Sequence, residues 1–193
     1  TKGLRWHSTD HDTELRVGGR LHADSAMFED DLTPIENDSA FRRARVYLAA
    51  KVGDRWRFRV EREFANDREG WRNLWARYNF DKKTWIKAGN FVAPFGLEDI
   101  AASNHATFME RSLPSALAPS YQTGLAFGKR NRLGSVRRRH HYSWVLSVGV
   151  EPMGDDMEDR HRSNHRSIAS RFAYAPIAED DRLVHLGVAA EHR

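Results

Sequence analysis

The chain has 193 residues and carries 31 lysines and arginines against 27 aspartates and glutamates, which gives a formal net charge of +4 at pH 7. This modest excess fits a surface that attracts anions and falls well short of a nucleic-acid-binding tail. Cysteine is absent, which excludes disulfides, thiolate metal sites and cysteine nucleophiles together.

Hydrophobic stretches are short throughout the chain. No run of roughly 18 or more apolar residues occurs, which excludes a transmembrane helix. A membrane barrel stays open, because its strands contribute only every second residue to a lipid-facing surface. The first residues, TKGLRWHSTDHD, lack an apolar core followed by a small-residue cleavage site, so we expect any signal peptide to have been removed already.

Residues 14–28 are predicted to form the first long strand. Apolar residues at odd positions alternate there with arginine, histidine and aspartate at even positions, and successive side chains of a strand point to opposite faces. The polar segment 29–39 contains Pro34 and is predicted to be a loop.

Residues 40–64 are predicted to form a hairpin of two long strands that turn at Gly53 and Asp54. Its apolar face would carry Ala44, Val46, Leu48, Trp56, Phe58 and Val60. Its other face would carry Arg43, Arg45, Tyr47, Lys51, Arg57, Arg59, Glu61 and Glu63. In a soluble protein the apolar face lies in a core, whereas in a membrane barrel it lies in lipid and the arginines face a water-filled lumen.

Further alternating segments predict strands over 73–80, 84–92, 124–128, 142–150, 167–174 and 184–191, which makes about nine strands in all. No convincing long helix appears, since the best candidate, near 99–110, has no clean apolar stripe. The turns at 52–54 and 81–83 are short, while the connection at 29–39 is longer. Short turns on one side and long loops on the other are typical of outer-membrane barrels.

The segment from about 93 to 121 interrupts the alternation. It contains three prolines and many small residues, and a long irregular segment between strands is usually functional or disordered. Its large apolar side chains favour an ordered loop that packs on another part of the protein.

Five strings stand in order along the chain: VGGRLHAD at 17–24, FRRARVYL at 41–48, GNFVAPFGLED at 89–99, FMERSLPSALAP at 108–119 and VHLGVAAEHR at 184–193. Together they resemble the phosphate-selective porin O and P family over nearly the whole chain. The PFGLE string followed by FMER is the most specific part of this resemblance, whereas the alternating strands alone are weak support.

The resemblance implies an all-β fold, a transmembrane antiparallel β-barrel that is 16-stranded and trimeric, with loops that fold inward to narrow the pore. About nine strands cannot close such a barrel, and open sheet edges do not survive in hydrocarbon. We therefore expect residues 1–193 to form a single domain that is the N-terminal portion of a longer porin. The implied partners are phosphate-like inorganic anions, lipid and lipopolysaccharide of a Gram-negative outer membrane, and other copies of the chain in a homotrimer.

Four arginines are candidates for the anion pathway. By the resemblance, Arg20, Arg42 and Arg43 occupy positions that line the constriction in phosphate-specific members, and Arg45 stands where those members can carry a tyrosine. An anion pore needs fixed positive groups facing its water, and the guanidinium group stays charged and forks onto phosphate oxygens. Strand periodicity independently puts Arg20, Arg43 and Arg45 on the polar face, and puts Arg42 on the other face unless the strand has a bulge there.

Arg57 and Lys87 fall on the same polar face and extend the predicted pathway. For Lys87 a solvated or salt-bridged lysine is the alternative. For the arginines the alternative is a structural role in the barrel wall, paired with Asp24, Glu61 or Glu63.

Two features of the long loop bear on its role. Glu110 and Arg111 are predicted to form an ion pair that pins the loop inside the barrel. Phosphate-specific members carry a lysine after the FGLE string, whereas this chain carries Asp99. A carboxylate there opposes phosphate, so we expect a general or weakly anion-selective pore that passes phosphate, pyrophosphate or polyphosphate among other anions.

The remaining signals are weaker. The basic run 137–141 resembles a nucleic-acid patch, but at a strand entrance it more often meets lipopolysaccharide phosphate or solvent, so no nucleic-acid partner is predicted. His161 and His165 have a spacing that suits a metal only on a helix, and this region is predicted to be loop and strand, so no metal site is predicted. No catalytic triad, carboxylate pair or phosphate-binding glycine loop occurs, which predicts a protein that is not an enzyme and needs no cofactor.

Two hypotheses of different classes follow. The first is a porin through which small anions diffuse passively, and the second is a soluble, basic, all-β module that binds polyanions. A porin exposes the apolar faces of its strands to lipid, whereas a soluble module must cover them with a second sheet. The residues that decide between them are Val46, Leu48, Trp56, Phe58, Val60, Trp144, Leu146 and Val148.

Overall fold

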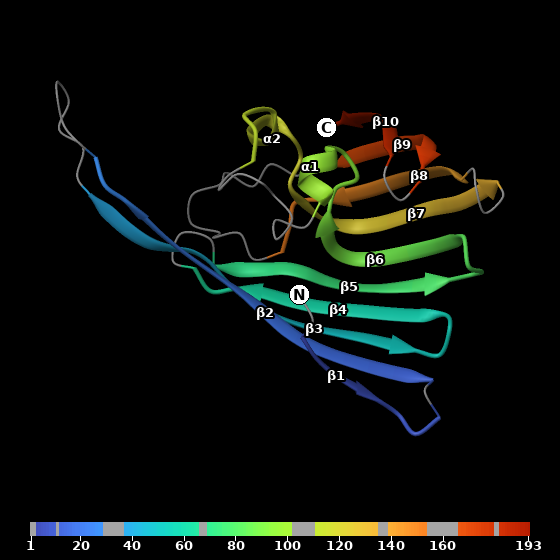
Figure 1. Ribbon diagram of the computed structural model, residues 1–193, viewed down its shortest axis with the longest axis horizontal. Helices are drawn as coiled ribbons and strands as arrows, with labels where there is room; N and C mark the ends of the chain where they lie inside the picture. The colour runs from blue at the N-terminus through green and yellow to red at the C-terminus, as the bar shows by residue number, and fades with distance from the viewer. Residues whose placement is uncertain are drawn as a thin grey trace.

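A computed structural model describes residues 3–10, 12–28, 37–65, 69–101, 111–134, 139–153, 166–179 and 182–193. Within these ranges ten strands form one antiparallel sheet, in which each strand pairs with its neighbours in the sequence from β1 to β10 (Figure 1). The strands are β1 Leu4–His7, β2 Thr13–Ala26, β3 Asp38–Val52, β4 Trp56–Glu63, β5 Gly70–Asn79, β6 Thr84–Val92, β7 Tyr121–Gly134, β8 Arg139–Val150, β9 Ser167–Ala178 and β10 Leu183–His192. The predicted all-β antiparallel architecture is confirmed, with β1 as a strand that the periodicity did not predict.

The predicted hairpin at 40–64 corresponds to β3 and β4. Val52 pairs with Trp56, and the turn between them contains Gly53 with a φ of +57°, a left-handed conformation that glycine adopts without steric cost. This tight turn sets the register of the whole hairpin, so that Tyr47 faces Glu61 and Lys51 faces Arg57.

β7 and β9 extend well past their predicted ends. β7 continues through the basic residues Lys129 and Arg130, which pair with Trp144 and Ser143 of β8, because the backbone ladder continues there whatever the charge of the side chains. β9 continues past Pro176, where a turn was predicted. The pairing of β9 with β10 shifts register between Val184 and Leu186, and a proline, which has no N–H to donate, is tolerated at such an irregularity.

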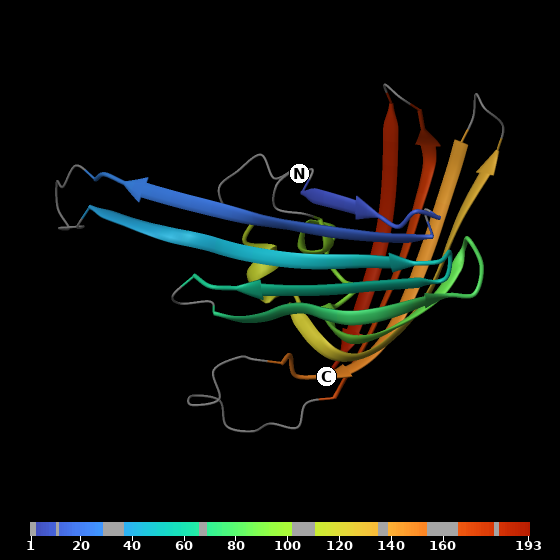
Figure 2. The same ribbon diagram turned by 90° about the horizontal axis from the view of Figure 1, so that it is seen from below.

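The sheet is strongly curved, so that β1–β6 and β8–β10 form two walls of a trough (Figure 2). The connection between β6 and β7 lies in the hollow and contains two single-turn helices, α1 Leu97–Ile100 and α2 Pro114–Leu117. The short turns at 53–55 and 80–83 lie at one end of the strands, and the connection that carries α1 and α2 leaves β6 at the other end (Figure 1). Most of the predicted loop at 29–39 lies outside the described residues. No helix in the described part of the chain is long and apolar enough to span a membrane.

Candidate functional site

Arg42 sits at a β-bulge. His22 of β2 pairs with Arg43 of β3, but the next residue, Ala23, pairs with Phe41, so Arg42 has no partner in the ladder. The Arg42 guanidinium forms an ion pair with Asp24, which has the same strand parity as Arg20 and His22. The bulge therefore turns Arg42 toward the polar face, which the strand period by itself does not predict.

Arg45 is held by two buried carboxylates. The Arg45 guanidinium forms an ion pair with Glu63, and its Nη1 lies 3.6 Å from Oε1 of Glu61. The other carboxylate oxygen of Glu61 lies 2.7 Å from Nη2 of Arg59. Glu63 is fully buried and accepts a further hydrogen bond from the backbone N–H of Ala44 at 2.6 Å. These contacts correspond to the wall pairing that the sequence left open as an alternative for Arg45.

Arg43 is also buried, with only 4% of its surface exposed, and its Nη1 lies 3.3 Å from Nδ1 of His22. Arg20 lies on the same face and pairs directly with Arg45 across β2 and β3. Arg20, Arg42, Arg43 and Arg45 thus lie together at the end of the sheet that carries the long connections. We refer to these four residues as the loop-side cluster.

The long connection brings Arg111 to two arginines of this cluster, Arg43 and Arg45. A small cavity of about 40 Å³ is lined by Arg43, Arg45, Val92, Asp99, Arg111, Ser120 and Tyr121. A Cβ atom added at Gly96 would fall 2.1 Å from Oδ2 of Asp99, which shows that this carboxylate lies against the Gly96 backbone. Three arginines and one aspartate therefore line a cavity of the size of a few water molecules or one small anion.

Only one partner of the predicted Glu110–Arg111 ion pair lies among the described residues, so that ion pair stays a prediction. Glu110 lies outside the described residues, and Arg111 donates from Nη2 to the carbonyl oxygens of Asp99 at 3.2 Å and Ala101 at 3.5 Å. On the opposite wall, Arg171 of β9 donates from Nη1 to the carbonyl oxygen of Phe95 at 2.6 Å. The connection therefore reaches from β3 to β9 across the hollow of the sheet.

Glu98, near the start of the connection, is hydrogen-bonded to Ser112 and Ser115 near its end. Its carboxylate accepts hydrogen bonds from Ser112 N at 2.9 Å, from the Ser112 hydroxyl, and from Ser115 Oγ at 3.1 Å. The Ser112 bonds lower the pKa of Glu98, so it stays ionised well into the acid range. Neither Arg171 nor Glu98 was predicted from the sequence, since nothing in a local pattern shows which carbonyl or serine a side chain will reach.

A second group of cations lies toward the short turns. Strand register places Lys51, Arg57, Arg77 and Lys87 directly opposite one another, from β3 to β6. We call these four residues the cation row. Like charges that face each other across a sheet are destabilising, and within the described residues no ion pair joins Arg57, Arg77 or Lys87 to a carboxylate.

Aromatic rings and one amide surround the cations of the row. Arg77 Nε donates to Oδ1 of Asn79 at 2.9 Å, and its guanidinium lies 4.5 Å from the centre of the Trp85 ring. Lys87 Nζ lies 3.9 Å from the centre of the Phe91 ring. Cation–π contacts of this kind hold a charged group without neutralising it.

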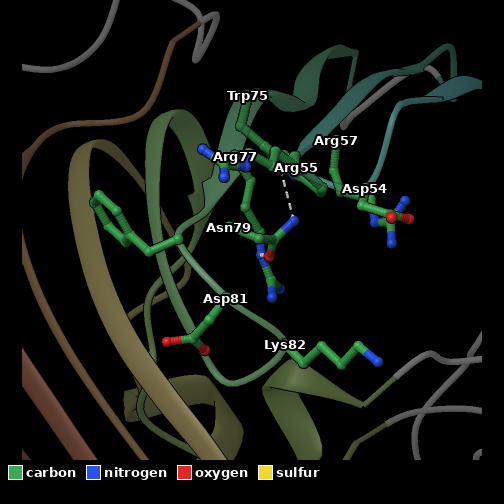
Figure 3. A pocket seen from close by; sticks show the side chains of 9 residues that line it. Asp54, Arg55, Arg57, Trp75, Arg77, Asn79, Asp81 and Lys82 are labelled. Carbon is green, nitrogen blue, oxygen red and sulfur yellow. Dashed lines mark hydrogen bonds between the residues drawn. The ribbon is translucent and has the colours of Figure 1, made fainter.

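An open pocket of about 570 Å³ adjoins the row (Figure 3). Its lining comprises Asp54, Arg55, Arg57, Trp75, Arg77, Asn79, Phe80, Asp81 and Lys82. Both acids are engaged in the turns. Asp54 lies 3.5 Å from Lys51 Nζ, and Asp81 accepts from the backbone N–H groups of Lys83 and Thr84, which lowers the pKa of Asp81. The pocket is therefore positively charged.

Of the residues predicted for the pathway, the structure brings Arg57 and Lys87 together through Arg77, which the prediction omitted along with Lys51. The missing signal was register. The short turns at 53–55 and 80–83 pair Lys51 with Arg57 and Arg77 with Lys87, and the register of β4 against β5, which no local pattern shows, joins the two pairs into one line. His161 and His165 lie outside the described residues, within which no cluster of three potential metal ligands occurs.

The other face of the sheet is apolar and uncovered. Val46, Leu48 and Leu146 remain 54%, 41% and 46% exposed, and all the described strands belong to the same sheet. At the end with the short turns, aromatic rings of this face form a continuous chain in which successive ring centres lie 5.0 to 6.4 Å apart. Its members are Trp56, Tyr78, Phe80, Phe127 and Trp144. An uncovered apolar face with an aromatic edge is typical of a barrel in lipid.

A family model described as phosphate-selective porin O and P matches residues 15–193. The chain belongs to this porin family. It is also similar to Porin O of Pseudomonas aeruginosa, with 26% identity over 202 residues that cover 99% of this chain. The same match covers 44% of that relative, so the chain spans less than half the length of the curated protein that it matches. The family is one of channels rather than enzymes.

Proposed function

We propose that this porin forms a water-filled pore in a Gram-negative outer membrane and that the cationic face of the sheet lines its lumen. The observation that carries the proposal is the contrast between the two faces. One face is apolar and uncovered, and the other presents a row of cations with no carboxylate among the described residues to neutralise its inner members. The free-energy cost of exposing that row of charges to lipid would be prohibitive, whereas a row that faces water attracts anions.

The proposed pathway has two regions, or stations, at which positive groups attract the anion. Arg45 of the loop-side cluster and Lys51 of the cation row are six residues apart on β3, which corresponds to about 20 Å along an extended strand. The cavity around Arg43, Arg45 and Arg111 would be the narrow station, and the cation row would be the wider one. Positive groups at both stations let an anion pass between them without being held tightly at either.

Asp99 bears on selectivity. Asp99 lines the same small cavity as Arg43, Arg45 and Arg111, and its negative charge there opposes the entry of a phosphate. The proposal is therefore a pore for small anions in general, with phosphate, pyrophosphate and polyphosphate among them. The closed barrel of about 16 strands, the homotrimer and the contacts with lipopolysaccharide belong to the same proposal.

The competing hypothesis is a soluble module that binds polyanions on its arginine face. It requires a second layer over the apolar face, and the described strands supply no such layer. Partition into detergent separates the two hypotheses, because only the porin needs detergent micelles to remain dispersed. A full-length protein that stays soluble and monomeric in plain buffer would overturn the porin proposal.

The direct test is conductance of the full-length protein in planar bilayers. Under a KCl gradient the reversal potential of an anion-selective pore has the sign set by chloride, and added phosphate should compete with chloride for the same lumen. A reversal potential of zero, or one with the sign set by potassium, would contradict the assignment of the cationic face to the lumen.

A further inference from the structure

His22 lies beside the loop-side cluster and, unlike the four arginines, has a side chain of the type that can change its charge near neutral pH. It pairs directly with Arg43 across β2 and β3, at the last regular position before the bulge. Its Nδ1 atom lies 3.3 Å from Nη1 of Arg43. The contact joins a titratable ring to an arginine that is 4% exposed and lines the narrow cavity.

The chemistry of this contact fixes the state of the ring. A guanidinium group has only donors, so Nδ1 of His22 must accept the hydrogen bond from Arg43. An accepting Nδ1 carries no proton, and the imidazole is then neutral with its proton on Nε2. A second proton would fill the accepting position and place two positive groups against each other.

The charged groups around His22 do not balance a positive charge on its ring. On its own strand His22 has Arg20 on one side and Asp24 on the other, and from β3 it faces Arg42 and Arg43. Asp24 is already paired with Arg42. Among the described residues, β1 pairs with β2 only over Glu14–Val17, so Leu4–His7 bring no charged group to His22.

We propose that His22 is a specificity-determining residue of this porin: as a neutral acceptor it holds Arg43 in the narrow cavity, and on protonation it releases Arg43 and adds a positive charge to the lumen. The inference rests on the proposed anion-pore function. Anion selectivity accordingly rises on acidification, as the protonated fraction of His22 grows.

The test is the reversal potential of the full-length porin in planar bilayers under a KCl gradient, at several pH values between 8 and 5. One unit charge acting across a few ångströms of water changes the ratio of chloride to potassium permeability about threefold. The wild-type protein should show this rise. His22→Asn, whose amide oxygen accepts from Arg43 near the position of Nδ1 at every pH, should match the wild type at pH 8 and stay flat down to pH 5.

His185→Asn is the matched control, because it removes a histidine from β10 at the far edge of the sheet and should keep the wild-type pH profile. A flat wild-type profile, or the same rise in His22→Asn, overturns the role of His22. Absence of anion selectivity at every pH instead overturns the pore proposal itself. If His22→Asn does not assemble, His22→Gln supplies a second side chain without a titratable proton, and the same outcomes apply.

Discussion

Arg77 is the central member of the cation row, and its replacement by glutamine separates the function of the row from its effect on folding. Arg77 pairs with Arg57 on one side and Lys87 on the other. At a charge separation of about 6 Å in water, each neighbour repels it by about 0.7 kcal/mol, so removal of the charge relieves about 1.4 kcal/mol. Loss of the cation–π contact with Trp85 costs about 0.5 to 1 kcal/mol.

These opposing effects are similar in size, and the glutamine amide can still donate to Asn79. The free energy of unfolding of Arg77→Gln should therefore lie within about 1 kcal/mol of the wild-type value. An anion near the row should lose about 1 kcal/mol of attraction, which corresponds to about a fivefold fall in the chloride to potassium permeability ratio. Urea unfolding in detergent checks the first expectation, and reversal potentials in planar bilayers check the second.

Arg62→Gln is the matched control. Arg62 lies on the neighbouring strand β4, where it pairs with Glu69 at 2.6 Å and lies 5.4 Å from the centre of the Trp71 ring. Its loss removes the same charge away from the cation row and should leave selectivity nearly unchanged. The reasoning fails if Arg62→Gln alters selectivity as much as Arg77→Gln, or if Arg77→Gln is strongly destabilised.

Three further predictions concern the loop-side cluster and the long connection. Arg45→Met leaves Glu63 buried without its partner and should lower the free energy of unfolding by about 3 kcal/mol in urea unfolding; a neutral effect would contradict the assigned pairing. Asp99→Asn removes a negative charge from the narrow cavity and should strengthen phosphate block of the chloride current about fivefold, whereas unchanged block would exclude Asp99 from the pathway. Glu98 has a lowered pKa, so its bonds to Ser112 stabilise the folded connection above the ordinary glutamate range and are lost as the pH falls through the folded-state pKa. Protease sensitivity of this segment should therefore rise in strong acid in the wild type and already at pH 7 in Glu98→Gln, and equal sensitivity of the two proteins at pH 7 would refute this.

Most of the strands were predictable, because alternation is visible in the sequence wherever one face of a strand meets water and the other does not. β3 and β4 show this well, since nearly every residue follows period two. β1 was missed because four residues are too few to establish a period. The extension of β9 past Pro176 was missed because a proline ordinarily argues for a turn, and only the register shift against β10 explains its place in a strand.

The candidate site was predictable only in part. The sequence placed Arg43, Arg57 and Lys87 on one face, but it could not show that Arg77 lies between two of them, because neighbours across strands are set by turn geometry and register. It also left open how Arg45 is paired. The structure joins it to Glu63, which lies 18 residues further along the chain.

The sequence by itself determined that this protein is a two-faced antiparallel sheet with apolar side chains on one side and arginines on the other, since that contrast is a local property of each strand. The tertiary structure decided which charges meet. It formed the bulge that turns Arg42 toward Asp24, placed His22 against Arg43, and carried the long connection across the hollow to Arg171. These contacts depend on hydrogen-bond ladders and chain paths between distant segments, which no local pattern encodes.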